Sequence, residues 1–196
     1  IRRVDVQSET IERYVREGKL IPDLVVPMSE HRTYKFFKQE SLERYAEQYD
    51  WKLIDDDNRK NLFMEMVEQM DMSYSYKPVL LKAVFANVDK QGRVKLDDIV
   101  GYFRSFYESR RKAGLVVEKS NSVYAKVGYT DKEAERNILS NPFKRFEDMN
   151  IMRHTKTLGI LEIDSSVWKK LSQEEIEKIV TICDKKLEEY FMRISK

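Results

Sequence analysis

Apolar residues recur at helical spacing over most of the 196-residue chain. Near the N-terminus, Ile11, Tyr14 and Val15 lie three and four residues apart, as they would along one face of an amphipathic helix. Ser8 can cap the start of this helix, and Gly18 stands where a left-handed residue commonly ends one. The pattern therefore predicts a short helix with a defined start and end.

A β-type pattern follows this helix. The runs 20–26 and 33–37 are rich in β-branched and aromatic residues, and the polar segment 27–32 separates them. They predict a hairpin with a polar tip. Over residues 40–49 the apolar positions return to helical spacing, so a second helix is expected after the hairpin.

Residues 50–58 interrupt the pattern with three consecutive aspartates, and they predict a boundary between two modules, 1–52 and 53–196. The second module should be mainly helical. In chain order its predicted elements are helices at 58–71 and 78–85, an extended segment at 93–96, a helix at 97–112, a loop at 113–128, one or two helices within 131–149, a hairpin of 151–154 with 159–163, and a long last helix after Ser172. The expected fold class is mainly α with short β-hairpins (α+β).

Two capping boxes support this assignment. Thr130 with Glu133, and Ser172 with Glu175, each have the spacing at which two side chains satisfy each other's backbone N–H groups. Each pair predicts the first turn of a helix.

Composition limits the class of protein. With 41% hydrophobic and 36% charged residues, the chain can form one large domain or two small ones. Its one cysteine, Cys183, excludes an internal disulfide and fits a reducing compartment. No apolar run approaches the length that spans a membrane, so we expect a cytoplasmic protein with no membrane partner.

Charge is distributed unevenly along the chain. Residues 1–52 contain 10 basic and 10 acidic side chains, whereas residues 101–156 contain 12 and 7. A neutral module can still present a basic face, because phosphate contacts depend on local charge. The positive excess nevertheless favours the second module as the part that binds a polyanion.

The segment 6–20, VQSETIERYVREGKL, resembles the turn, recognition helix and exit of the winged helix-turn-helix of the MerR and excisionase group. In such motifs the second helix reads the major groove of duplex DNA, and the hairpin, or wing, lies on the phosphates. The family's first helix would precede Val6, so either the chain is cut from a longer protein or that helix is vestigial. The resemblance implies DNA contacts by Arg13, Arg16, Lys19, His31 and Arg32.

The predicted second module has the order helix, short strand, helix, helix, hairpin and closing helix, which is that of a winged helix. We therefore expect two winged-helix-like modules in tandem. Residues 131–149 would occupy the reading position and 153–156 the wing. The cations expected to contact phosphates are Lys132, Arg136, Lys144, Arg145, Arg153 and Lys156.

Three further segments, 75–83, 103–107 and 141–149, resemble the C-terminal end of DEAD/DEAH-box helicases of bacterial restriction and phage-defence systems. Such proteins often also carry a phospholipase-D-like nuclease domain. The resemblance implies an accessory DNA-recognition region with a helicase or nuclease upstream in the same protein. The phosphate-binding loop of a motor, GxxxxGK[ST], does not occur in the sequence.

Several of these residues also have plainer interpretations. Arg13 and Arg16 can belong to a solvated helix face supported by nearby glutamates. His31, His154 and Cys183 lack the spacing of metal ligands, and Cys183 lies in an apolar stripe typical of a core. No acid pair has a distinctive neighbour, so we expect no catalytic residue, metal or cofactor.

The sequence thus predicts a non-catalytic region that recognises target DNA, taken from a restriction or defence helicase or nuclease. Two alternatives stay open. The chain can instead be a protein-docking module that uses its first module and its long last helix, or a free-standing transcriptional regulator.

Overall fold

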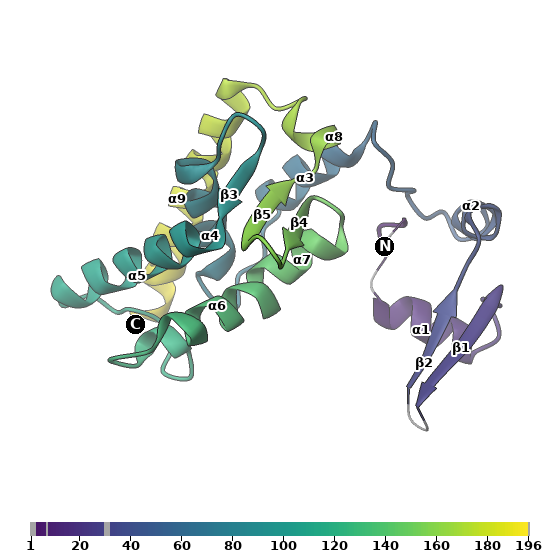
Figure 1. Ribbon diagram of the computed structural model, residues 1–196, viewed down its shortest axis with the longest axis horizontal. Coiled ribbons are helices and arrows are strands. Elements are labelled where there is room, and N and C mark those ends of the chain that lie inside the picture. Colours follow the sequence, from purple (N-terminus) through teal and green to yellow (C-terminus); the bar gives the residue numbers. More distant parts are fainter. Residues whose placement is uncertain (1–2, 7, 30–31, 196) are drawn as a thin grey trace. The chain divides into compact units, whose positions relative to one another are not determined.

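The computed structural model describes residues 3–6, 8–29 and 32–195, and the chain divides into two compact units, Ile1–Asp55 and Asp56–Lys196 (Figure 1). The boundary follows Asp55, whereas the sequence pattern placed it after Lys52. The described residues are mainly helical with two small antiparallel sheets, as the hydrophobic pattern predicts.

Unit 1 has the predicted order of helix, hairpin and helix. Gly18, just after the first helix, has φ +70°, which confirms it as the left-handed residue that ends this helix. The elements are α1 (Ser8–Arg16), β1 (Leu24–Ser29), β2 (Arg32–Phe36) and α2 (Gln39–Gln48).

The hairpin begins later than predicted. Leu20 is buried, and its N–H donates to the Tyr14 carbonyl at 3.1 Å. The N–H of Ile21 donates to the Tyr45 hydroxyl at 3.0 Å. These bonds hold the first residues of the predicted strand against the two helices, so strand pairing starts only at Leu24.

The two ends of unit 1 meet. Val4 forms an isolated antiparallel bridge with Leu53, and backbone hydrogen bonds of 2.8–2.9 Å lie on either side of it. The small apolar core that this closure completes consists of Val4, Leu20, Tyr45, Ala46 and Ile54.

Unit 2 is built around a three-stranded antiparallel sheet of order β3-β5-β4. Its elements are α3 (Arg59–Glu68), α4 (Tyr76–Asn87), β3 (Arg93–Lys95), α5 (Leu96–Lys112), the 3-10 turn η1 (Val123–Ala125), α6 (Asp131–Ser140), α7 (Pro142–Asp148), β4 (Met152–Thr155), β5 (Ile160–Ile163), α8 (Ser165–Trp168) and α9 (Gln173–Ile194). The predicted second hairpin is therefore present as β4 and β5.

Helix α4 is the buried centre of unit 2, as its apolar sequence predicts. Leu80 and Leu81 are fully buried, and burying each such side chain contributes about 1.5–3 kcal/mol. The helix packs against α5 and α9. Pro78 lies in its first turn, where the missing N–H leaves no helical bond unmade.

The irregular segment between α5 and α6 is anchored by a buried carboxylate. Glu118 accepts hydrogen bonds from the Ser75 N–H at 2.9 Å, the Ser75 hydroxyl at 2.5 Å and the Lys119 N–H at 2.9 Å. The Tyr190 hydroxyl also donates to it. Since Ser75 caps α4 and Tyr190 lies on α9, this one side chain connects the segment to both helices.

A tight turn before β3 packs against α8. Gly92 has φ +83°, and a Cβ atom placed on it would lie 2.7 Å from Cγ of the Trp168 ring. The indole N–H of Trp168 donates to the Lys90 carbonyl at 3.1 Å. The ring is therefore fixed over the backbone of the turn.

A buried arginine connects α3 to α8. Nη1 of Arg59 donates to Asp164 at 3.1 Å and to the Ser166 hydroxyl at 2.6 Å, and it also donates to the exposed Asp56 at 2.7 Å. Asp164 caps α8 by accepting from the Ser166 N–H at 2.9 Å. The charged groups of Arg59 and Asp164 are thus both hydrogen-bonded.

Candidate nucleic-acid interface

Helix α6 has one buried and one exposed face. The predicted capping box at its start is confirmed, because the Thr130 and Glu133 side chains each bond the other's backbone N–H. The box formed by Ser172 and Glu175 at the start of α9 is confirmed in the same way. With Ala134 and Ile138 of α6 buried, Glu135 and Arg136 between them are exposed.

A groove of about 460 Å³ lies between this outward face, α7 and the end of β4. Its lining includes cations, acids and a few apolar side chains. The lining residues are Lys132, Glu135, Arg136, Leu139, Ser140, Phe143, Glu147, His154 and Lys156.

Three of the predicted DNA-contacting residues meet at this groove. Lys132 and Arg136 come from α6, and Lys156 comes from the turn that follows β4. Within residues 3–6, 8–29 and 32–195, no carboxylate lies within 4 Å of any of these three cations. Their charges are therefore available to a ligand.

The acids of the groove are not equivalent. Glu147 is 3.1 Å from Nζ of Lys144, which also lies 2.8 Å from Asp148. Lys144 donates a hydrogen bond to each carboxylate. These bonds raise its pKa, and the bond to Asp148 is the larger cause. No such ion pair is formed by Glu135 in the described part of the chain, so it is the acid that a phosphate would meet unneutralised.

His154 lies on β4 at the inner side of the groove. Its ring is edge-on to Phe143, with centroids 6.2 Å apart, and its Nε2 atom is buried with no hydrogen-bond partner among the described residues. The sequence analysis discounted His154 as a metal ligand and gave it no role of its own, although it lies within the predicted wing, 153–156.

The remaining predicted cations of unit 2 lie elsewhere. Lys144 is occupied by the two acids of its own helix. Arg145 is half-buried on α7, and its charge, after burial as the main cause, lowers the pKa of Lys77 on α4. Arg153 is exposed on the outer face of the sheet, 3.6 Å from Asp164. The groove lining includes none of these three.

The predicted contacts of unit 1 are only partly gathered. Arg13 and Arg16 are exposed on α1. Lys19 pairs with Glu17 at 2.7 Å, and its ammonium lies 5.0 Å from the centre of the Tyr14 ring. His31 lies outside the described residues, as does the side chain of Arg32, whose backbone begins β2.

Several lining residues were missed by the sequence reasoning. Glu135, Leu139 and Ser140 follow Lys132 at three, seven and eight residues, which is the spacing of one helix face. This periodic signal could have identified them. Glu147 and Phe143 depend on how α7 is placed against α6, which no local pattern gives.

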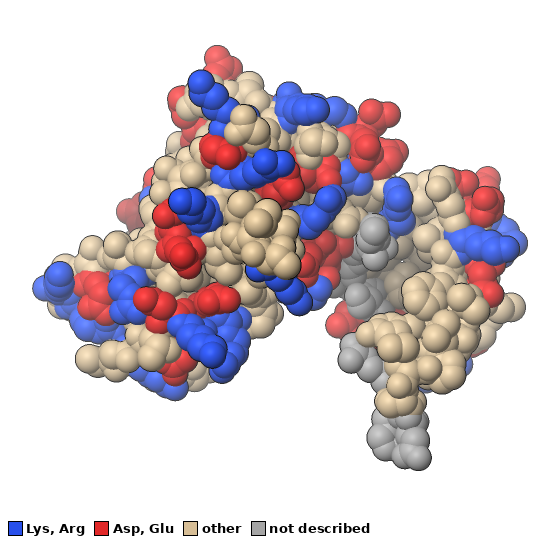
Figure 2. Space-filling view, in the orientation of Figure 1, with Lys and Arg blue, Asp and Glu red and all other residues tan. Residues whose placement is uncertain are grey.

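Charges of both signs are mixed on the surface. On the face of unit 2 in Figure 2, Lys and Arg side chains alternate with Asp and Glu among the described residues, and no broad field of one sign forms there. A polyanion would therefore be held by local contacts more than by a long-range field.

Metal-ligand clusters and the single thiol were the remaining candidates for reactive chemistry. No three of their His, Cys, Asp or Glu side chains gather as a metal site would require. Cys183 is fully buried, and burial raises the pKa of its thiol to about 12, so the thiol is protonated and enclosed at neutral pH.

Among the helices that the structure describes, none is both long enough and apolar enough to span a bilayer. Comparisons with protein families, with curated proteins and with solved structures find no match to the chain.

Proposed function

We propose that the chain binds duplex DNA through the groove between α6, α7 and the β4–β5 hairpin, and that it carries out no bond-making itself. The observation that carries the proposal is the meeting of Lys132, Arg136 and Lys156 at one groove, although α7 and β4 separate Lys156 from the other two in the sequence. Ammonium and guanidinium groups without internal partners are the groups that replace counterions on phosphates.

The order of elements supports the same function. The run α4, β3, α5, α6 with α7, β4, β5 and α9 is the order of a winged helix, and β3 closes the sheet beside β5. If this order reflects a winged helix, α6 and α7 would occupy the reading position and the turn after β4 would be the wing. A DNA strand lying between them would contact cations on both sides.

Local charge in the groove favours phosphate binding by a small margin. The groove lining has three cations, Lys132, Arg136 and Lys156, and two acids, Glu135 and Glu147. Glu147 is neutralised by Lys144, which leaves Glu135 as the acid without an ion-pair partner among the described residues. Such a site positions DNA without strong sequence selection, because phosphate contacts carry no sequence information. Unit 1, with Arg13 and Arg16 exposed, would be a secondary contact.

We also propose that the chain is the target-recognition end of a restriction or phage-defence helicase or nuclease. This rests on the resemblance of segments 75–83, 103–107 and 141–149 to such proteins. In that context the chain would place the upstream motor or nuclease on duplex DNA.

The test compares charge-reversal variants for duplex affinity. Lys132→Glu, Arg136→Glu and Lys156→Glu combined should weaken binding by at least about tenfold, and losing three phosphate contacts should flatten the slope of log K against log salt by about 2.7. The matched control reverses three exposed lysines outside the groove, Lys90, Lys169 and Lys185. Equal losses in both triple variants, or no binding by the unaltered chain at low salt, would refute the proposal.

A further inference from the structure

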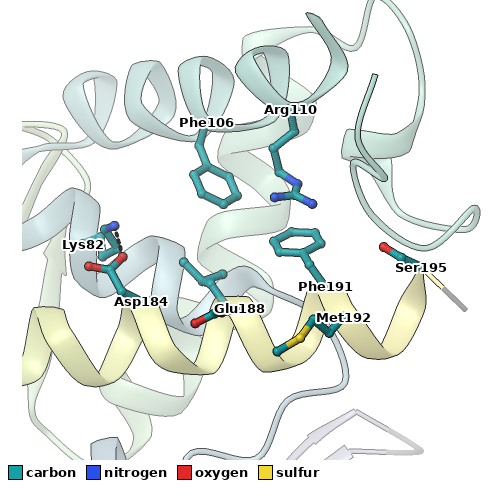
Figure 3. A pocket seen from close by; sticks show the side chains of 9 residues that line it. Lys82, Phe106, Arg110, Asp184, Glu188, Phe191, Met192 and Ser195 are labelled. Carbon is teal, nitrogen blue, oxygen red and sulfur yellow. Dashed lines mark hydrogen bonds and ion pairs between the residues drawn. The ribbon is translucent and has the colours of Figure 1, made fainter. Parts of the chain in front are cut away.

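A second groove, of about 480 Å³, runs along α9 where that helix faces α4 and α5 (Figure 3). The α9 residues that line it recur at helical spacing over three turns, and they are Asp184, Leu187, Glu188, Phe191, Met192 and Ser195. At 1.5 Å per residue this wall is roughly 16 Å long. The α9 wall is therefore as long as a three-turn helix.

The middle of the groove is apolar. Phe106 reaches from α5 toward α9, and its ring lies 6.2 Å from that of Phe191 (Figure 3). Met192 is 56% exposed beside them. Beyond the end of α5, Leu115 and Val116 are also exposed. Phe191 itself is 6% exposed, so the apolar surface that the groove offers comes from Met192 and the half-buried Phe106. Exposed apolar surface in a groove is typical of sites of association with other proteins.

The groove walls carry two cations, Lys82 and Arg110, and two carboxylates, Asp184 and Glu188, and the two cations differ in their partners. Lys82 on α4 forms an ion pair with Asp184 on α9 (Figure 3). Arg110 on α5 has its guanidinium 3.3 Å from the centre of the Phe191 ring, and its Nε donates to the Val116 carbonyl at 2.8 Å. Among residues 3–6, 8–29 and 32–195, no carboxylate lies within 4 Å of Arg110.

Partial burial of the Arg110 guanidinium removes some of its hydration in the free chain. The side chain is half-buried, and burial lowers its pKa, although Tyr107 and the buried Glu118 act in the opposite direction. A cation that is partly removed from water and has no acid partner gains most from a carboxylate brought by a ligand. The planar guanidinium suits a bidentate pair of this kind.

We propose that this groove is the docking site of an amphipathic helix from a partner protein, which sets apolar side chains against Phe106, Phe191 and Met192 and an Asp or Glu carboxylate against Arg110. The length of the α9 wall fits a three-turn helix, and the apolar middle of the groove does not suit a phosphate backbone. Arginine and aromatic residues are the residue types that dominate binding energy at protein interfaces.

This groove shares no lining residue with the one proposed for DNA. The partner helix therefore does not compete for Lys132, Arg136 or Lys156, and the docking proposal does not depend on DNA binding. A chain with both sites would connect a partner protein to duplex DNA.

The experiment selects binders for the full chain from a displayed library of helical peptides about 14 residues long, which covers the groove wall. Enriched peptides should carry apolar residues at helical spacing and an Asp or Glu at a fixed offset from them. Their affinity should fall by at least about tenfold for Met192→Glu and for Arg110→Gln. The control is Lys185→Glu, on α9 but outside the groove lining, which should leave affinity unchanged.

Circular dichroism of each variant separates lost folding from lost docking, and Met192→Glu tests an exposed position that folding does not need. Three results would overturn the proposal. The first is that the enriched peptides carry no recurrent acid, and the second is that Lys185→Glu reduces their affinity as much as the groove variants do. The third is a concentration-dependent dimer of the chain that Met192→Glu abolishes, which would assign the groove to a second copy.

Discussion

At the scale of single residues, Gly92 is a position with no room for a side chain. Its φ of +83° disfavours any side chain, and the Trp168 ring occupies the space that a Cβ would need. Gly128 also has positive φ, at +75°, but a Cβ there would meet nothing within 4 Å. The two glycines therefore separate backbone strain from steric clash.

We expect Gly92→Ala to lower the free energy of unfolding by about 3 kcal/mol, against about 1 kcal/mol for Gly128→Ala. The difference should come from displacement of the Trp168 ring. Urea unfolding followed by tryptophan fluorescence measures both. Equal losses in the two variants would show that the ring moves aside without cost.

A second residue-scale prediction concerns the acids of the DNA groove. Glu135→Gln removes a negative charge with no ion-pair partner in the described structure, so duplex affinity should rise by about threefold. Glu147→Gln should have a smaller effect, because Lys144 already neutralises that carboxylate. Fluorescence anisotropy with a labelled duplex tests both variants. A fall in affinity for Glu135→Gln would instead make this side chain a contact to a base.

Lys144 and Arg145 were both predicted to contact phosphates, and only the surroundings of Lys144 could have been read from the local sequence. Lys144 has Glu147 and Asp148 three and four residues away, so its ion pairs could have been predicted from spacing alone. Arg145 is one residue further along, yet its half-buried position near Lys77 depends on α7 packing against α4. Such packing has no signature in a single sequence.

At the scale of elements, α8 has only four residues, and the side chain of Asp164 connects its start to the rest of the unit. Asp164 caps it and also pairs with the buried Arg59 of α3. Burial alone would raise the pKa of Asp164, but the hydrogen bonds from Ser166 and the charges of Arg59 and Arg153 outweigh it and lower the pKa. The ionised carboxylate is thus the form that the fold stabilises.

A lowered pKa in the folded state means that this stabilisation is fully present above the ordinary pKa of aspartate, about 4, and is lost as pH falls through the folded value. We expect Asp164→Asn to cost about 2 kcal/mol at pH 7 and progressively less below pH 4. Denaturation curves at several pH values measure this. The exposed Asp56→Asn is the control and should cost much less. A cost for Asp164→Asn that does not change with pH would exclude the ion pair as its cause.

Elements with strong periodicity were predicted well and irregular ones were not. The helices α4, α5 and α9 follow apolar stripes, and the two predicted capping boxes begin α6 and α9, so the existence of these helices could be predicted from the chain alone. Residues 113–128 were expected to be a loop, which is correct, but their attachment through Glu118 to Ser75 spans 43 residues of sequence. Hydrogen bonds over such separations form only once the helices have packed.

At the scale of the whole molecule, the chain consists of two units that each have a core of their own. The groove proposed for DNA and the groove proposed for a partner helix both lie in unit 2. Unit 1 supplies few fully buried residues, and its hairpin exposes Leu24, Met28 and Phe36. Most of the proposed activity therefore belongs to residues 56–196.

A fragment of residues 56–196 should accordingly fold and bind duplex DNA with an affinity within about threefold of the full chain, because domains with their own core fold independently. Thermal unfolding and anisotropy measure the two properties. The complementary fragment 1–55 should bind much more weakly. If the larger fragment folds but has lost binding, Arg13 and Arg16 of unit 1 become the principal contacts.

The enclosed thiol of Cys183 has a practical consequence. It is the single cysteine of the sequence, it is fully buried, and its pKa of about 12 keeps it protonated in neutral buffer. Maleimide reagents attack thiolates that they can reach, so the folded chain should stay unmodified by them. A dye can then be attached at one introduced surface position, such as Lys185→Cys, without first removing the native residue. Energy transfer from this dye to a labelled duplex would follow DNA binding in real time.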